Sequence, residues 1–420
     1  MSDGPRRAGA PPAPDAAEAL PAPSRNSQRG LDWFIFFLAD VQTGFGPFVA
    51  VYLTTQKWTQ VEIGLVLSVS GLVALVGQMP GGALVDAARS ERLVAGIAVA
   101  MISVAALAYA AWPIFPVILG AATLHALASC VLGPSIAAIS LGLVGRAAIG
   151  ERFGRNARFA SLGNGIAAAV MGTCGYFLSS RSVFLVTIAL TVPTLFALSR
   201  IHAGEIDPER AHGAVRRAGP DKSATSVMSL LRKRPLLIFA GGVLLFQLAN
   251  AAMLPIMAGV LTTRSSNWAT VLIALCIVVP QIVVAAMSPW VGRKAQAWGR
   301  RPLLLIGLAA LPIRGLLFAT VGDPYLVVVV QVLDGITAAV LSVMMPLVVA
   351  DVTYGSGHFN LAQGIVGTAT GIGASLSTVL AGYITDRFGS SVAFIGLAAV
   401  AAMALLVVWA LLPETRRSDE

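Results

Sequence analysis

Long apolar blocks, rather than alternating apolar and polar positions, dominate this chain. Crossing a bilayer as a helix takes about 20 apolar residues, and twelve blocks reach that length. Their expected bounds are 31–54, 60–86, 92–112, 115–143, 156–180, 182–200, 235–261, 268–292, 302–321, 325–350, 360–385 and 389–412. No stretch shows the alternation over ~10 residues that is typical of a membrane β-strand. The pattern predicts an all-α membrane protein with 12 transmembrane helices.

Composition agrees with the pattern. The chain is 56% hydrophobic and only 12% charged, about half the charged fraction of a soluble domain. Residues 1–30 are rich in Pro, Ala and charge and lack an apolar core. This segment is neither a secretory signal nor a folded domain, and we expect a disordered cytoplasmic tail.

The distribution of Lys and Arg predicts an orientation. With a cytoplasmic N-terminus, one set of loops and tails holds 24 basic residues and the opposite set holds 4. Such asymmetry is typical of cytoplasmic loops, so we expect both termini in the cytoplasm. The net charge of +9 is then explained by topology, and nucleic-acid binding is excluded. High Ala, Arg and Pro usage favours a bacterial inner membrane as the location.

The chain repeats itself at about half its length. Pro47 and Pro255 stand 208 residues apart, and Gly82 and Gly292 stand 210 apart. Further matches keep nearly the same offset and order. The repeat predicts two pseudo-symmetric six-helix bundles, 31–200 and 235–412. They are joined by a cytoplasmic linker at 201–234 and followed by a short tail at 413–420.

Two loops carry a family resemblance. GGALVDAARSER (81–92) and VGRKAQAWGRR (291–301) occupy matching places in the two halves. Both resemble the Gly-x-x-x-Asp-Arg/Lys-x-Gly-Arg-Arg/Lys loop of the major facilitator superfamily. The matching positions are Gly82, Asp86, Arg89, Arg92, Gly292, Gly299, Arg300 and Arg301. The resemblance implies a secondary transporter that works by alternating access, with its site between the halves.

The resemblance also implies a cytoplasmic gate. In this superfamily the loop acid latches onto a helix N-terminus of the other half, where the helix dipole favours a carboxylate. Asp86 fits that role, whereas Gln296 replaces the second acid. We therefore expect an acidic latch in the first half and none in the second. An alternative is that these charges only solvate tight turns and fix the topology.

Polar side chains inside the spans are the candidates for a substrate or proton cavity. A charge at the bilayer centre costs about 2.5–3.5 kcal/mol, so such groups face the bundle interior or a partner. The candidates are Asp40, Gln42, His125, Gln247, Asn250, Arg314 and Asp334. Arg314 and Asp334 lie at similar depths on consecutive helices, which also allows a purely structural ion pair.

Titratable groups in cavity helices would suit proton coupling. Asp40 has Gly44 on the same helix face, which leaves room beside the carboxylate. His125 matches Asp334 in the repeat, and histidine titrates near neutral pH. Hydrogen-bonded packing remains an alternative for both residues. Prolines predict helix kinks that allow bending, at Pro47, Pro134, Pro255 and Pro346.

The leading hypothesis is a secondary active transporter of a small organic solute, by proton-coupled efflux. Uptake of a small metabolite and a non-transporting sensor remain alternatives. A membrane enzyme is disfavoured because the four histidines are scattered. No phosphate-binding loop for ATP is present. We expect no cofactor, no metal, lipid-embedded monomers, and three cysteines that serve in packing.

Overall fold

The computed structural model describes residues 23–43, 47–214, 230, 232–264 and 269–416. Regular structure within these residues is helical throughout. The first half contains α1 (Arg25–Thr43), α2 (Pro47–Thr55), α3 (Gln60–Ala87), α4 (Glu91–Ala111), α5 (Phe115–Phe177) and α6 (Ser182–Ser199). The linker adds η1 (Ala203–Glu205) and α7 (Pro208–Ala211). The second half contains α9 (Arg234–Asn250), α10 (Met253–Arg264), α11 (Ala269–Trp298), α12 (Arg300–Thr320), α13 (Pro324–Val352), α14 (Phe359–Phe388) and α15 (Ser390–Leu411).

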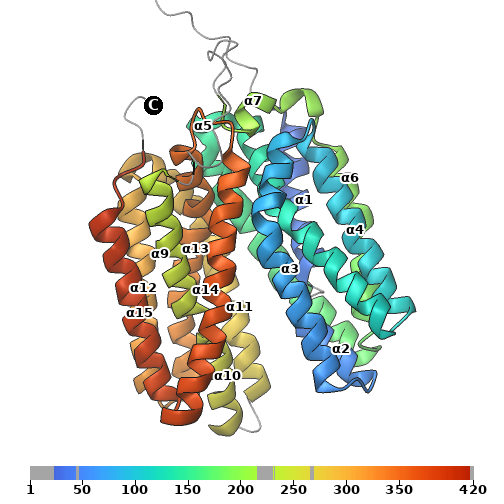
Figure 1. The fold of residues 1–420 in the computed structure, drawn as a ribbon, viewed down its shortest axis with the longest axis vertical. Helices are drawn as coiled ribbons and strands as arrows, with labels where there is room; N and C mark the ends of the chain where they lie inside the picture. Colours follow the sequence, from blue (N-terminus) through green and yellow to red (C-terminus); the bar gives the residue numbers. More distant parts are fainter. Residues whose placement is uncertain (1–22, 44–46, 215–229, 231, 265–268, 417–420) are drawn as a thin grey trace, which may run out of the picture.

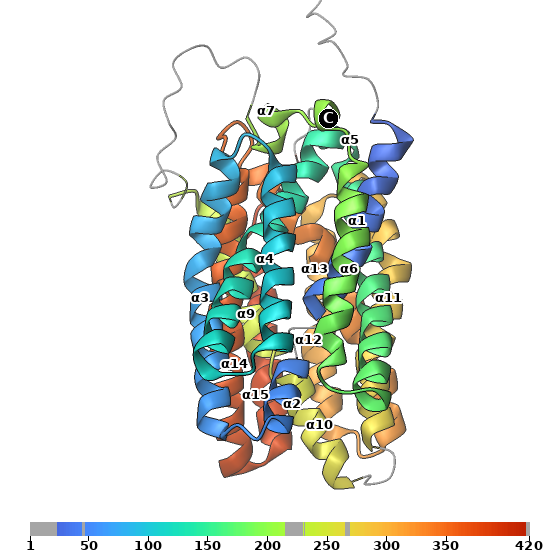
Figure 2. The same ribbon diagram turned by 90° about the vertical axis from the view of Figure 1, so that its right-hand side faces the viewer.

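The two halves stand side by side with their helices along the long axis (Figure 1). Helix α7 lies at one end of the molecule, while α2 and α10 lie at the other (Figure 2). We call the end with η1, α7 and the α3–α4 turn the linker face. The ribbons of the two halves approach each other at the linker face and diverge toward the opposite face (Figure 1).

The apolar pattern produces the expected twelve crossings. Among the described residues, ten helical stretches are long and apolar enough to span a membrane. One of these stretches runs over 61 residues, Phe115–Gly175, and is long enough to cross twice. Helices α1 and α2 together supply the remaining crossing, and residues 44–46 between them lie outside the described part of the chain. The predicted 12-helix membrane fold is therefore confirmed.

A single glycine separates the two crossings within α5. At about 1.5 Å per residue, 61 straight residues would extend far beyond a bilayer that is about 30 Å thick. Gly145 has φ 66° and ψ −174°, inside the run that otherwise has helical geometry. Glycine adopts a positive φ without a Cβ clash, so the chain reverses here at the linker face.

A proline lies just after a break in the first crossing of the second half. Helix α1 ends at Thr43, and α2 begins at Pro47. Turn residues separate α9 from α10 at residues 251 and 252, one turn before Pro255. A proline removes the hydrogen bond to the carbonyl four residues earlier, which accounts for the break between α9 and α10. Pro134 and Pro346 instead lie inside α5 and α13, which continue through them.

The N-terminal boundary at residue 30 was wrong, because α1 already begins at Arg25. Ser24 accepts a hydrogen bond from the Ser27 backbone N–H at 3.2 Å, and Ser24 N–H donates to Glu205 Oε2 at 2.9 Å. A capped helix start that is tied to the linker can form in polar sequence. Residues 1–22 of the expected tail lie outside the described residues.

The C-terminal segment also makes a contact that its composition does not suggest. Both carboxylate oxygens of Glu414 accept hydrogen bonds from the start of α12, from the N–H groups of Arg300 at 2.9 Å and Arg301 at 3.0 Å. A carboxylate at a helix N-terminus satisfies unpaired donors and complements the helix dipole. Glu414 therefore holds the chain end against the linker face.

Candidate functional site

A chamber of about 510 Å³ lies between the two halves. Its volume falls in the range of small-molecule sites. Helices α1, α3 and α5 line it from the first half, and α13 and α14 from the second. The polar side chains among its lining residues are Gln78, Asn156, Ser342, Gln363 and Thr370, and none of the described lining residues is ionisable. Pro134 and Pro346 line it as well.

Glycines close the space between the halves at the linker face. A Cβ built on Gly82 would lie 2.1 Å from the carbonyl oxygen of Asn360, and one on Gly292 would lie 2.2 Å from that of Gly150. These contacts form the α3–α14 crossing and the α5–α11 crossing, respectively. Small residues let transmembrane helices approach this closely.

The two crossings are related by the sequence repeat. Gly82 and Gly292 are 210 residues apart, and so are their partners Gly150 and Asn360. One turn deeper, Gly364 packs on the Gln78 carbonyl and Gly154 packs on the Ser288 carbonyl, again with the same offset. The repeat therefore places equivalent glycines at equivalent helix crossings, and together the two crossings form what we call the linker-face seal.

Asp86 lies at the N-terminus of α14, in the other half. Its Oδ1 accepts from the Asn360 backbone N–H at 3.1 Å and from Asn360 Nδ2 at 2.9 Å. Its Oδ2 accepts from the Leu361 N–H at 2.7 Å. A carboxylate here satisfies backbone donors that the helix leaves open. The contact implied by the resemblance is therefore present across the seal.

The second half has no acid at the position that matches Asp86, as expected, but another acid is present at this crossing. Gln296 occupies the matching position, and its Nε2 donates to the carbonyls of Arg146 and Ala147 at 3.4 Å. The acid comes instead from α13. Asp351 pairs with Arg300 of its own half at 2.8 Å and with Arg146 of the first half at 3.2 Å. A motif comparison cannot find this acid because it lies on another helix.

The remaining gate positions have varied surroundings. Arg89 is exposed and Arg92 is partly buried, and neither forms an ion pair within the described part of the chain. Gly299 has φ 90°, a backbone conformation that would be strained for a residue with a side chain. The Arg301 side chain hydrogen-bonds to the Trp409 carbonyl. Arg301 thus holds α12 against α15 within one half rather than bridging the two.

A buried polar network lies behind the chamber wall. Asn156, a lining residue, accepts from Arg152 Nε at 2.7 Å and donates to Ser140 Oγ at 2.8 Å. Arg152 donates to Asp32 Oδ1 at 2.6 Å, and Arg155 also pairs with Asp32. Sequence reasoning overlooked Asp32. Two sequence features could have indicated this network: an acid at the start of an apolar block, and two arginines three residues apart on a later helix.

Arg314 and Asp334 form an ion pair between α12 and α13. The Arg314 side chain is 2% exposed and the Asp334 side chain 25% exposed. Burying both charges together avoids the cost of an isolated charge in the membrane. The structural alternative raised for these two residues is therefore observed, and neither lines the chamber.

The other predicted cavity residues are not part of the described chamber lining. Gln42, His125, Gln247 and Asn250 are all partly buried. Asn250 has a buried Oδ1 without a hydrogen-bond partner among the described residues. Asp40 lies in the last turn of α1, but its side chain is outside the described part of the structure. The chamber is instead lined by amides that the sequence did not single out.

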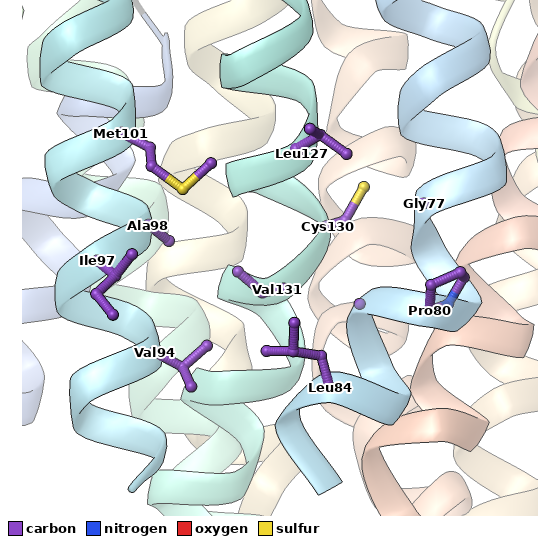
Figure 3. A pocket seen from close by; sticks show the side chains of 11 residues that line it. Gly77, Pro80, Leu84, Val94, Ile97, Ala98, Met101, Leu127, Cys130 and Val131 are labelled. Atoms are coloured by element: carbon purple, nitrogen blue, oxygen red, sulfur yellow. The ribbon is translucent and has the colours of Figure 1, made fainter. Parts of the chain in front are cut away.

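A second hollow, of about 420 Å³, has a different location (Figure 3). Its lining residues come only from α3, α4 and α5 of the first half, and all are apolar or glycine, with Cys130 between α3 and α5. A groove within one half does not lie between the two bundles. We therefore take the inter-half chamber, and not this groove, as the candidate site.

Comparison with known proteins agrees with this architecture. The family profile described as Major Facilitator Superfamily matches residues 33–294 and 239–420. The chain belongs to the major facilitator superfamily. Proteins from two Mycobacterium tuberculosis strains, each named an uncharacterized MFS-type transporter, are 39% identical over 396 residues, or 93% of this chain and 94% of theirs. The chain is accordingly a membrane transporter of this superfamily and not an enzyme.

Solved structures of transporters share the fold. The proton:xylose symporter XylE has a TM-score of 0.69 at 15% identity, over 93% of this chain and 96% of its own. The nucleoside transporter NupG has a TM-score of 0.64 at 18% identity, over 92% and 100%. A human organic anion transporter scores 0.67 at 15% identity, over 92% and 100%. At such low identity, these similarities show the fold alone.

Proposed function

We propose that this transporter exports a small, uncharged organic solute from the cytoplasm, driven by proton entry. The observation that carries the proposal is the chamber between the halves, sealed at the linker face. Such a chamber is the central site of an alternating-access cycle, in which the two repeats rock around it. The linker face is the cytoplasmic face in this proposal, because the loops assigned to it hold 24 of the 29 basic residues.

The chamber wall favours an uncharged solute. Its described lining offers apolar surface and amide or hydroxyl groups, but no charge. The nearby carboxylate of Asp32 is already paired with both Arg152 and Arg155. Neither Gln78 nor Gln363 has a hydrogen-bond partner for its side-chain amide within the described residues, so both amides are available to a solute. A polyanion or polycation would find no counter-charge among the described lining residues.

Proton coupling is assigned to Asp40. It is an acid in the last turn of α1, the first helix of the first half. A carboxylate that is alternately hydrated and desolvated changes its proton affinity. The solute and the proton would then bind the transporter alternately, as antiport requires.

The test begins with a deletion strain grown against a panel of toxic organic compounds, followed by transport of any responsive compound in proteoliposomes. We expect Gln78→Leu and Gln363→Leu to reduce transport about five-fold, since one hydrogen bond is worth about 1 kcal/mol. Gln281→Leu, on α11 outside the chamber lining, is the matched control. Equal effects of all three changes would remove the chamber from the mechanism.

Direction and coupling are tested separately. We expect an imposed inward proton gradient to drive export, and Asp40→Asn to abolish gradient-driven export while solute exchange continues. Net uptake driven by the same gradient would favour a metabolite importer. Unchanged pumping by Asp40→Asn would show that this carboxylate does not couple transport. A reporter enzyme fused to the C-terminus tests the cytoplasmic placement of the linker face.

A further inference from the structure

The linker between the halves is bound to both of them at the linker-face seal. On the first half, the Asp207 N–H donates to the Gly142 carbonyl at 3.2 Å. On the second, the Phe359 N–H donates to the His212 carbonyl at 3.3 Å, and the Gly355 N–H donates to the Gly213 carbonyl at 2.8 Å. Separating the halves at this face would therefore disturb the linker too.

His212 of the linker lies beside the Asp86 latch. Its Nε2 is 3.0 Å from Glu91 Oε1, and the Glu91 side chain is only 5% exposed. The residue before His212, Ala211, accepts from Asn360 Nδ2 at 3.4 Å, and the same amide group donates to Asp86. Four elements thus meet around the carboxylates of Glu91 and Asp86: the linker, α3, α4 and α14. The His212 imidazole is placed to offset the negative charge of these two groups.

We propose that His212 is a positioning residue for the Asp86 latch, and that the proton on its imidazole strengthens the linker-face seal. With the imidazole charged, one cation stands against Glu91 and near Asp86. Without that charge, the buried Glu91 carboxylate loses its counter-ion next to a second acid, and like charges disfavour the closed arrangement. The proposal goes beyond transport of a solute, since it concerns what holds the transporter closed.

The pH range follows from the surroundings of the imidazole. Contact with the Glu91 carboxylate raises the pKa of His212 above 6.5, and the charge of Asp86 adds to this, while burial opposes it. A group whose pKa is higher in the closed state stabilises that state at low pH. That stabilisation is lost as the pH rises through the raised pKa. The seal should therefore loosen on the alkaline side of pH 6.5.

The charged groups around His212 come from several elements. Glu91 on α4 and Asp86 on α3 are the acids that act on it. Asp207 and Arg210, on its own segment, pair with each other. His358 precedes α14 and is a second titratable group near the seal. His202 pairs with Glu205 elsewhere on the linker and is 62% exposed. His358 and His202 therefore provide matched control histidines.

The first experiment measures how far apart the halves are at the linker face. Spin labels at Ala87→Cys and Arg293→Cys, both exposed positions of opposite halves, would be placed in a variant without native cysteines and reconstituted in nanodiscs. We expect pulsed electron paramagnetic resonance to show a closed population that falls between pH 6 and 9. No solute is needed, so this outcome is independent of the proposed function.

Variants separate charge from structure. His212→Gln should give a smaller closed population that no longer depends on pH in this range. His212→Lys should restore a large closed population across it, because the cation is permanent there. His202→Gln and His358→Gln should keep the profile of the unmodified chain. A normal pH profile in His212→Gln, or no recovery in His212→Lys, would overturn the proposal.

A second measurement needs no movement of the halves. The protein has four histidines, so histidine-labelled samples give few signals, and His212→Gln assigns one of them. We expect the titration midpoint of His212 above 6.5, and Glu91→Gln to lower it by about one pH unit, as for loss of a close opposite charge. A midpoint that Glu91→Gln leaves unchanged would contradict the proposed pairing.

Discussion

The α3–α14 and α5–α11 crossings are built on the same glycine contacts but are secured by different charges. At the first, Asp86 accepts three hydrogen bonds from the start of α14. At the second, the neutral Gln296 takes the matching place, and Asp351 supplies the negative charge from α13. The close approach of the helices is therefore repeated in the two halves, whereas the electrostatic fastening is not.

This difference has a physical basis. Backbone-to-backbone contact tolerates only glycine, so both copies of the repeat retain it. A carboxylate can reach the seal from any neighbouring helix, so its position is free to differ between the halves. The first crossing uses backbone donors at a helix start, and the second uses two arginines. Their responses to mutation should therefore differ.

The largest effect is expected for Asp351→Ala at the second crossing. Its partner Arg300 is 1% exposed and would be left as a buried, uncompensated charge. Removing one partner of such a pair costs about 3–5 kcal/mol. Denaturant unfolding of the purified protein measures the loss. Asp386→Ala, an exposed acid toward the end of α14, is the control and should be nearly neutral.

Asp86→Ala should come next, at the first crossing. Hydrogen bonds to a charged group contribute about 1.5–3 kcal/mol, and two backbone N–H groups would lose their acceptor. We expect the closed population in the spin-label experiment to fall sharply. An unchanged closed population in Asp86→Ala would mean that Asp86 is not a latch. The loop charges would then only solvate the turn and fix the topology.

Gly82→Ala and Gly292→Ala test the shared part of the two crossings. Each new Cβ would overlap a backbone carbonyl oxygen, at 2.1 and 2.2 Å, and overpacking costs about 1–3 kcal/mol. Both variants should lose similar amounts of stability in thermal unfolding. Gly64→Ala, in open space, should cause no loss. Clearly unequal losses at Gly82 and Gly292 would break the symmetry described here.

The smallest effect is expected for Gln296→Ala. The Gln296 side-chain nitrogen donates two long hydrogen bonds of 3.4 Å to carbonyls where α5 reverses. The side-chain oxygen accepts a third hydrogen bond from Arg300 at 3.0 Å. The two bonds to carbonyls are neutral and contribute about 0.5–1.5 kcal/mol each, and Arg300 keeps its pairing with Asp351 when the amide is lost. The spin-label distances should shift less than in Asp86→Ala. A larger shift than in Asp86→Ala would mean that the amide, and not the acid, is the stronger fastening.

Much of the architecture could be predicted from the chain. Spans of apolar residues must satisfy their backbone groups internally, so their length and number indicate membrane helices. The Arg314–Asp334 pair was foreseeable from depth alone. The resemblance placed a site between the halves, but the lining of the chamber was not foreseeable, because Gln78 and Gln363 look like any span amide until α3 and α14 are brought together. Asp32 and Asp351 were missed because their partners lie more than fifty residues away along the chain.

What the sequence determined by itself is the membrane environment, the twelve crossings, the repeat and the glycines that mark it, since all of these depend on composition and on spacing along one chain. Which polar groups meet depends on the tertiary structure. The fastening by Asp351, the network around Asp32, the amides of the chamber and the contact of His212 with Glu91 all join distant segments. Such contacts depend on how the two bundles are oriented against each other, and no local pattern of residues encodes that orientation.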